Sequence, residues 1–126
     1  MTKGNTMIDE KKWNLLNAMA LCYGTEDYHT NDNLSFDYTD GVKTFCENAQ
    51  AYWLLDLVES VVKTKPEMNS DLICITLKVK EDNTARITFR KRIKIIHNQK
   101  IPFTDCPNGE WKFYYKDKTF FWCDEY

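Results

Sequence analysis

Glycine, proline and histidine are scarce in this chain of 126 residues, which contains four, three and two of them. With so few glycines, the sequence has no Gly-x-Gly-x-x-Gly, P-loop or Gly-x-Ser-x-Gly pattern to cradle a phosphate or to present a nucleophilic serine. Its two histidines, His29 and His97, have no partner at the spacing of a zinc motif. We therefore expect no metal site, no cofactor and no enzyme activity.

Long apolar runs and cysteine pairs are also missing. No stretch approaches the roughly 20 apolar residues that a membrane span needs, and the first residues lack the apolar core of a signal peptide. The five cysteines are an odd number without a Cys-x-x-Cys pair, which is typical of reduced thiols. We expect a soluble cytoplasmic protein without a membrane partner.

Charge is distributed unevenly along the chain. Residues 1–70 hold 6 Lys and Arg against 11 Asp and Glu, whereas residues 71–126 hold 11 against 8. The basic part of such a protein can attract a nucleic-acid backbone or an acidic protein surface. The second half of the chain is therefore the first place to search for a binding surface.

The chain length and apolar content fit a single domain, residues 1–126, of which we expect 1–8 to be flexible. Apolar residues at helical spacing predict a first helix near residues 10–22. A second and central helix is predicted over residues 39–63. The polar stretch between them, 25–38, has no periodic pattern and is expected to be a loop.

After residue 70 the apolar period changes from 3.6 to 2, which predicts strands. Alternating residues at 73–79 and 85–90 predict a hairpin. Further strands are predicted at "IKII", "KIPF", "EWKFYY" and "TFFWC", with a tight turn at "KDK" between the last two. Two helices followed by about five strands indicate an α+β fold: a meandering antiparallel sheet with the central helix packed on one face.

Several segments resemble a family of short uncharacterised bacterial proteins, a domain of unknown function. The resemblance covers about residues 21–126 and rests on "YGTEDY", "YTDGVKTFCENAQAYWLLDLV", "EDNTARIT", "IPFTDCP" and the terminal "DEY". It implies an origin in plasmids, integrated elements or phages but no activity. The motif residues that it singles out are Tyr38, Thr39, Asp40, Gly41, Ala51, Tyr52, Trp53, Asp56, Thr104 and Asp105.

Asp56 falls inside the apolar stripe predicted for the central helix. A buried carboxylate must be hydrogen-bonded or paired, or else it takes up a proton. It could act as a general base in a pocket with Tyr52 and Trp53, or it could be a structural acceptor that ties the helix to a loop or strand. We favour the structural interpretation, because no second catalytic group lies nearby in the sequence. Asp40 and Asp105 stand in cap and turn contexts, which explain them better than metal binding.

Outward positions of the predicted hairpin are rich in cations. The expected basic sheet face consists of Lys78, Lys80, Arg86, Arg90, Lys91, Arg92 and Lys94. No aromatic residues alternate with these cations, so base stacking is not supported. A possible exposed aromatic edge, suited to protein binding or homodimerisation, consists of Tyr114, Phe121 and Tyr126.

These patterns lead to three functional hypotheses. The first is a non-catalytic binding protein of mobile-element or phage type, an anti-CRISPR-like inhibitor that binds a host effector protein or ribonucleoprotein in the bacterial cytoplasm. The second is a small enzyme with a pocket around Asp56. The third is direct RNA or DNA binding through the basic face, for which a steep salt dependence is the expected sign.

Overall fold

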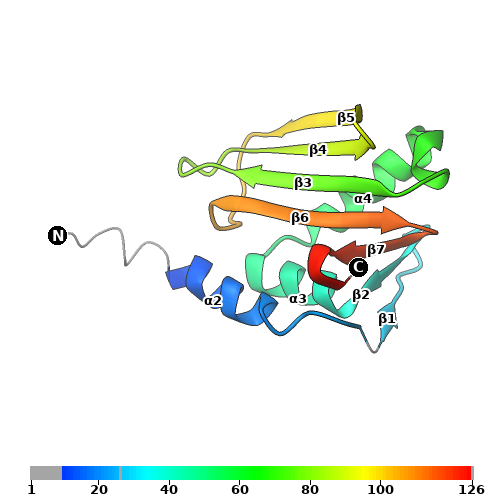
Figure 1. Ribbon diagram of the computed structural model, residues 1–126. Coiled ribbons are helices and arrows are strands. Elements are labelled where there is room, and N and C mark those ends of the chain that lie inside the picture. The colour runs from blue at the N-terminus through cyan, green and yellow to red at the C-terminus, as the bar shows by residue number, and fades with distance from the viewer. Residues whose placement is uncertain (1–9, 26, 126) are drawn as a thin grey trace.

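The computed structural model describes residues 10–25 and 27–125, so the expectations for residues 1–8 and for Tyr126 lie outside the described residues. Within them the chain forms three α-helices and a seven-stranded mixed sheet, which confirms the α+β prediction (Figure 1). The helices are α2 (Glu10–Met19), α3 (Asp40–Ala49) and α4 (Trp53–Thr64), with short 3-10 helices η1 (Pro66–Asn69) and η2 (Cys123–Glu125).

The strands are β1 (Tyr28–His29), β2 (Asp37–Thr39), β3 (Ile73–Val79), β4 (Ala85–Lys91), β5 (Lys94–Ile101), β6 (Gly109–Lys116) and β7 (Thr119–Trp122). Their order across the sheet is β1-β2-β7-β6-β3-β4-β5, with β2 and β7 parallel and the other pairs antiparallel. The predicted meander is therefore interrupted, because β6 pairs with β3 and not with β5. This pairing leaves β5 at one edge of the sheet.

Two details of the predicted strands need correction. The segments "IKII" and "KIPF" belong largely to one strand, β5, which a bulge opposite Phe89 and Arg90 makes irregular. The segment 25–38 is not entirely a loop, because it contributes the short strands β1 and β2. The "KDK" turn is confirmed: Asp117 and Lys118 both have positive φ, as the tight turns of hairpins require.

The predicted central helix is two helices. Gln50 takes the left-handed conformation, with φ 53° and ψ 47°, and the amide of Ala51 donates to the Cys46 carbonyl. Gln50 therefore caps the C-terminus of α3 in the left-handed conformation that glycine usually takes at this position. The first helix is also shorter than expected, because α2 ends at Met19 and continues only as turns.

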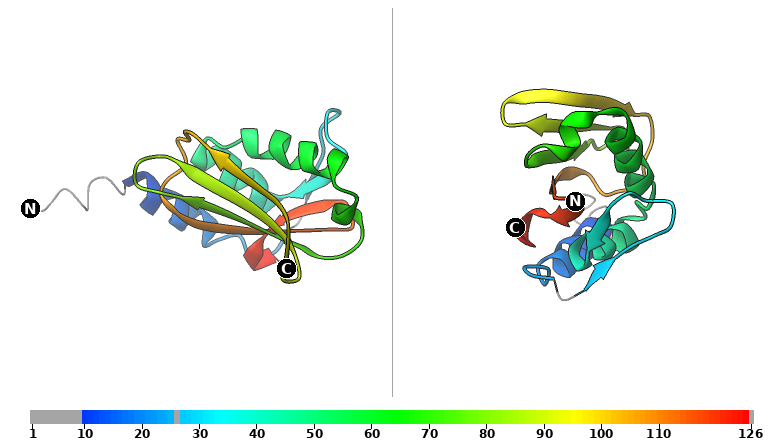
Figure 2. Two further views of the ribbon diagram at one scale, coloured as in Figure 1. Left: turned by 90° about the horizontal axis from the view of Figure 1, so that it is seen from above. Right: turned by 90° about the vertical axis from the view of Figure 1, so that its right-hand side faces the viewer.

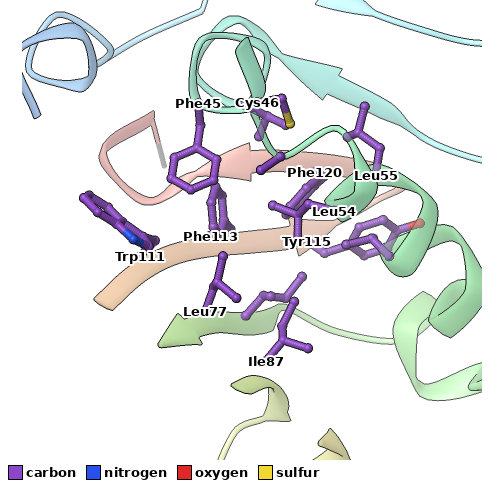
Figure 3. Packing of buried hydrophobic residues seen from close by; sticks show 14 of the residues in the cluster. Phe45, Cys46, Leu54, Leu55, Leu77, Ile87, Trp111, Phe113, Tyr115 and Phe120 are labelled. Carbon is purple, nitrogen blue, oxygen red and sulfur yellow. The ribbon is translucent and has the colours of Figure 1, made fainter. Parts of the chain in front are cut away.

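The helices lie on one side of the sheet, and the core fills the space between the two layers (Figure 2). α2 packs against α3, and α3 packs against β7. Alternate residues of the strands point into the core, where the side chains of α3 and α4 meet those of β3, β4, β6 and β7 (Figure 3). The other face of these strands, which we call the outer face, carries no helix among the described residues (Figure 1).

Candidate functional site

Cations dominate the outer face of the sheet. The register places Lys78 opposite Arg86, and Arg86 opposite Lys100, so these three side chains form a row across β3, β4 and β5. Glu110 stands opposite Lys78 on β6 and ends the row. The outward cations of these strands, all exposed, are Lys78, Arg86, Arg90, Lys100, Lys112 and Lys116. Glu110 is the one acidic residue at the outward positions of β3 to β6, so this face is strongly basic.

Within residues 10–25 and 27–125, few of these charges are neutralised by an acidic side chain. Glu110 lies 3.4 Å from the Lys112 ammonium, and an Arg86 guanidinium nitrogen donates to the Asn98 side-chain oxygen over 2.7 Å. Both contacts lie at the surface, where an ion pair contributes only about 0–1 kcal/mol. The cations therefore remain accessible to an anionic partner.

The predicted basic face divides into two groups. Lys78, Arg86 and Arg90 lie on the outer face as expected. Sequence reasoning did not assign Lys100, Lys112 and Lys116 to it. Lys112 and Lys116 were missed because alternation within a strand does not reveal that β6 pairs with β3. Lys100 lies on β5, whose full extent the sequence pattern did not show. The pairing of residues 73–79 with 109–115 is the contact that adds the lysines of β6.

The remaining predicted cations lie at the two ends of the hairpin strands. The ammonium of Lys91 donates to the Ser70 hydroxyl, Arg92 pairs with Asp71 at 3.5 Å, and Lys94 stands opposite Lys91 beside the tight turn. Lys80 follows β3 at the opposite end. These four residues do not belong to the continuous outer face, although the sequence pattern grouped them with it.

The predicted aromatic edge is not an edge. Tyr114 and Phe121 are cross-strand partners on β6 and β7, with ring centroids 5.9 Å apart, and both strands have neighbours on each side. Phe121 is buried and Tyr114 half-buried. They form a small apolar area at one end of the outer face, while Tyr126 lies outside the described residues.

The motif around Thr39 forms a junction with the C-terminal segment. The Glu125 carboxylate accepts hydrogen bonds from the Thr39 hydroxyl at 2.5 Å, the Gly41 amide at 2.9 Å and the Trp122 amide at 2.9 Å. Thr39 is the N-cap of α3, and its hydroxyl accepts from the Val42 amide. A carboxylate at a helix N-terminus stabilises the helix through both hydrogen bonds and the helix dipole. We call Thr39, Gly41, Trp122 and Glu125 the C-terminal junction.

Other motif residues also have structural contacts. The Asp40 carboxylate lies 2.7 Å from His29 Nε2 and accepts from the Asp27 amide, which ties α3 to β1. Thr104 is buried, and its hydroxyl accepts from the Cys106 amide within a turn. Asp105 is exposed beside this turn. The prediction that Asp40 and Asp105 belong to helix starts and turns agrees with these positions.

The prediction that Asp56 is a buried acceptor that ties the central helix to a loop or strand is wrong. Asp56 is exposed, whereas Glu59 on the same helix is buried and accepts from the Ser35 amide at 2.6 Å and from the Ser35 hydroxyl at 2.7 Å. Burial by itself raises the pKa of Glu59, but the Ser35 hydrogen bonds and the nearby Lys63 ammonium outweigh it and lower the pKa. The carboxylate that ties α4 to a loop is Glu59.

The break at Gln50 explains this error. Helix α4 turns its own apolar residues, including Leu54 and Val58, toward the core, so the stripe of α3 does not continue through it. Asp56 lies two residues before Val58, about 160° round the helix from it. A continuous helix would have hidden Asp56, but the two separate helices expose it.

Asp56 lies instead in an open groove of about 470 Å³ between α4 and β5, lined by Trp53, Asp56, Leu57, Ser60, Gln99, Ile101 and Phe103. We call this the β5 groove. The predicted pocket of Asp56 with Tyr52 and Trp53 is only partly present, because Tyr52 does not line it. Within this lining, Asp56 has no second titratable side chain to form an acid–base pair.

The described residues also offer little other site chemistry. Burial raises the pKa of both Cys46 and Cys106 to about 12, which keeps these thiols protonated and unreactive at neutral pH. Among residues 10–25 and 27–125, no group of three or more His, Cys, Asp or Glu side chains is placed to hold a metal ion. No helix in this part of the chain is long and apolar enough to cross a membrane.

Comparisons with known proteins identify the family but not an activity. No curated protein and no solved structure gives a significant match to the chain. One family model, described as a family of unknown function (DUF6876), matches residues 13–126 and so begins earlier than the region of about 21–126 expected from the motifs. The chain therefore belongs to this family of unknown function, DUF6876.

Proposed function

We propose that this protein is a non-catalytic binding domain whose outer sheet face docks on an acidic surface of a partner protein or ribonucleoprotein. The observation that carries the proposal is the excess of six exposed cations over one acid on a sheet face that no described helix covers. Such a face provides electrostatic steering and charge complementarity to an anionic partner.

The residues between the cations favour a protein surface over stacked bases. Thr76, Thr88 and Asn98 form the central row of the face, and each is short and polar. A platform for single-stranded nucleic acid would place exposed aromatic rings there. Contact with phosphates of a ribonucleoprotein remains compatible with the cations, because phosphate contacts need charge without base readout.

The host process in the proposal comes from an analogy of gene context. Small single-domain proteins of phages, plasmids and integrated elements often act by binding a host factor, and inhibitors of CRISPR effectors are one such class. The five cysteines are free thiols, as suits a protein that works in a reducing bacterial cytoplasm. We infer that the protein inhibits a host defence system by binding to an effector of that system.

The enzyme hypothesis is the second candidate, and its site is the β5 groove. Asp56 lies there beside Trp53 and Ser60, but an acid–base mechanism needs a second group within reach. Asp56→Asn would remove any activity that depends on this carboxylate. A partner that is still captured by the Asp56→Asn variant supports the binding function over the enzymatic one.

The test is capture of a partner from bacteria that carry defined CRISPR effectors. The tagged protein is purified with and without ribonuclease treatment, in parallel with the double variant Lys78→Glu, Arg86→Glu. We expect one effector to co-purify in stoichiometric amount with the wild type. At least about tenfold less should co-purify with the variant, and a tenfold loss of affinity corresponds to about 1.4 kcal/mol.

A control variant separates position from net charge. Lys11→Glu with Lys118→Glu makes the same change of net charge at exposed residues that are not part of the outer face, since Lys11 lies on α2 and Lys118 in the turn after β6. It should capture the partner as the wild type does. Equal capture by the wild type and by the Lys78→Glu, Arg86→Glu variant would contradict the proposal. Loss of the partner after ribonuclease treatment would show that RNA takes part in the contact.

A further inference from the structure

The edge strand β5 exposes backbone groups along one side. It is the last strand in the sheet order, it is eight residues long, and no described strand pairs with its outer edge (Figure 1). Unpaired N–H and C=O groups of an edge strand are a template on which another extended segment can form hydrogen bonds. Such a segment would continue the sheet beyond β5.

The two faces beside this edge differ in chemistry. On the helix side, the β5 groove presents Trp53, Leu57 and Ile101, together with Phe103, which is 62% exposed. On the outer side, Lys100 lies on β5 itself and Arg86 on the next strand. Adjacent strands lie only about 4.8 Å apart, so an added strand would contact the apolar groove with one face and these cations with the other.

Electrostatic repulsion disfavours the pairing of this edge with β5 of a second copy of the chain. An antiparallel pair of two β5 strands would bring two basic outer faces into one continuous sheet, with Lys94 and Lys100 of each copy along the shared edge. Lysines near both ends of an edge strand and a bulge within it are also the features by which proteins prevent self-pairing. The same lysines attract a segment of opposite charge.

We propose that β5 accepts an extended segment of a partner protein by strand addition, and that this segment alternates apolar and acidic residues. Side chains alternate between the two faces of a strand, so apolar residues would enter the β5 groove while acidic residues meet Lys100 and Arg86. Asp56 in the groove repels carboxylates, so the acidic face of the added segment turns away from the groove and toward Lys100. This inference rests on the proposed function, because it specifies how an acidic partner is recognised.

The test uses synthetic peptides and the full-length protein. The probe is a fluorescein-labelled eight-residue peptide in which glutamate and valine alternate, and its binding is followed by fluorescence anisotropy. Two further peptides carry N-methyl groups, one on all the valines and the other on all the glutamates. Because alternate amides of a strand point to opposite edges, only one methylated set faces β5. We expect that peptide to bind at least about tenfold more weakly, because it loses its backbone hydrogen bonds to β5, and the other to bind like the parent.

A side-chain variant tests the groove. Phe103→Ala removes an exposed ring beside β5 and should weaken the parent peptide about three- to tenfold, equivalent to about 0.7–1.4 kcal/mol. Tyr23→Ala is the matched control, because Tyr23 is 77% exposed and does not line the groove. It should leave peptide binding unchanged.

The outcomes separate this inference from the proposed function. Equal binding of both methylated peptides would overturn strand addition and leave electrostatic docking on the outer face intact. Absence of binding by the parent peptide would also overturn strand addition. The capture experiment with Lys78→Glu, Arg86→Glu tests docking on the outer face independently of this result. Loss of binding with Phe103→Ala and with one methylated peptide would support the inference.

Discussion

Two parts of the sheet, its interior around β7 and its β5 edge, are built in opposite ways. Around β7, the C-terminal junction joins α3 and the last residues of the described chain through a carboxylate that accepts three hydrogen bonds. At the β5 end, the strand edge is unpaired, the groove beside it is open, and the cations of the outer face have few partners. Of the residues that the resemblance singles out, Thr39 and Asp40 make structural contacts near the first part, whereas Trp53 and Asp56 line the β5 groove. The surfaces proposed for binding are the β5 edge and the outer face.

Gly41→Ala should have the largest effect on stability, because the added methyl group would lie within the C-terminal junction. A Cβ atom at residue 41 would lie 2.6 Å from Glu125 Oε1 and 2.8 Å from the Cβ of Trp122. Exchanging glycine for alanine normally stabilises a helix by up to about 1 kcal/mol. Here we expect the free energy of unfolding to fall by about 1–3 kcal/mol, the usual cost of overpacking, as measured by urea denaturation.

A double-mutant cycle with Glu125→Ala tests the cause. The single variant Glu125→Ala leaves the Thr39 hydroxyl and the amides of Gly41 and Trp122 without their acceptor, and should cost about 1–3 kcal/mol. In that background Gly41→Ala should cost less, because the carboxylate it collides with is gone. Fully additive losses would show that the two residues do not interact.

The sequence predicted the elements whose pattern is local. The period of two in β3, β4 and β6 is visible in the sequence because one face of each strand is buried. In the "KDK" turn, Asp117 is of a residue type that tolerates positive φ. Gln50 gave no sign of the helix break, since glutamine rarely takes the left-handed conformation and the apolar residues on both sides suggest continuity. The position of Asp56 was therefore beyond sequence reasoning alone.

Contacts between distant segments were the second limit. The pairing of β6 with β3, and the parallel pairing of β2 with β7, join residues that no local periodicity relates. Without them, Lys112 and Lys116 could not be added to the outer face, and β5 could not be recognised as an edge. The resemblance identified both "YTDG" and the terminal "DEY", but the contact of Glu125 with Gly41 is visible only in three dimensions.

Glu59→Gln and Asp56→Asn compare two carboxylates three residues apart on α4. Glu59 is buried and hydrogen-bonded to Ser35, so its neutralisation should lower the free energy of unfolding by about 1–2 kcal/mol. Asp56 is exposed, and its neutralisation should change stability by less than about 0.5 kcal/mol. Thermal and urea denaturation of the two variants measure this difference. A larger loss with Asp56→Asn would restore Asp56 as the structural anchor.

The pH dependence of the same pair gives a second measurement. The folded-state pKa of Glu59 is lowered relative to its ordinary value of 4.5, so its ionised form stabilises the folded protein. That contribution is fully present above the unfolded-state pKa and is lost as pH falls through the folded-state pKa. The stability of Glu59→Gln should therefore approach that of the wild type as pH falls below 4.5 and through the lower folded-state pKa of Glu59. A constant difference down to acidic pH would assign the loss to packing.

The smallest effects on stability are expected from Phe103→Ala beside β5 and Lys78→Glu on the outer face, which replace exposed side chains. Each should change the free energy of unfolding by less than about 0.5 kcal/mol, because neither residue is buried. Urea denaturation of both variants, beside Gly41→Ala, compares the proposed binding surfaces with the C-terminal junction in one experiment. A loss of 2 kcal/mol or more, on the order of a cavity in the core, would mean that these surfaces also support the fold. Stability near the wild type together with lost binding means that these side chains serve the partner, since a residue that contributes little to folding has no structural reason to affect capture.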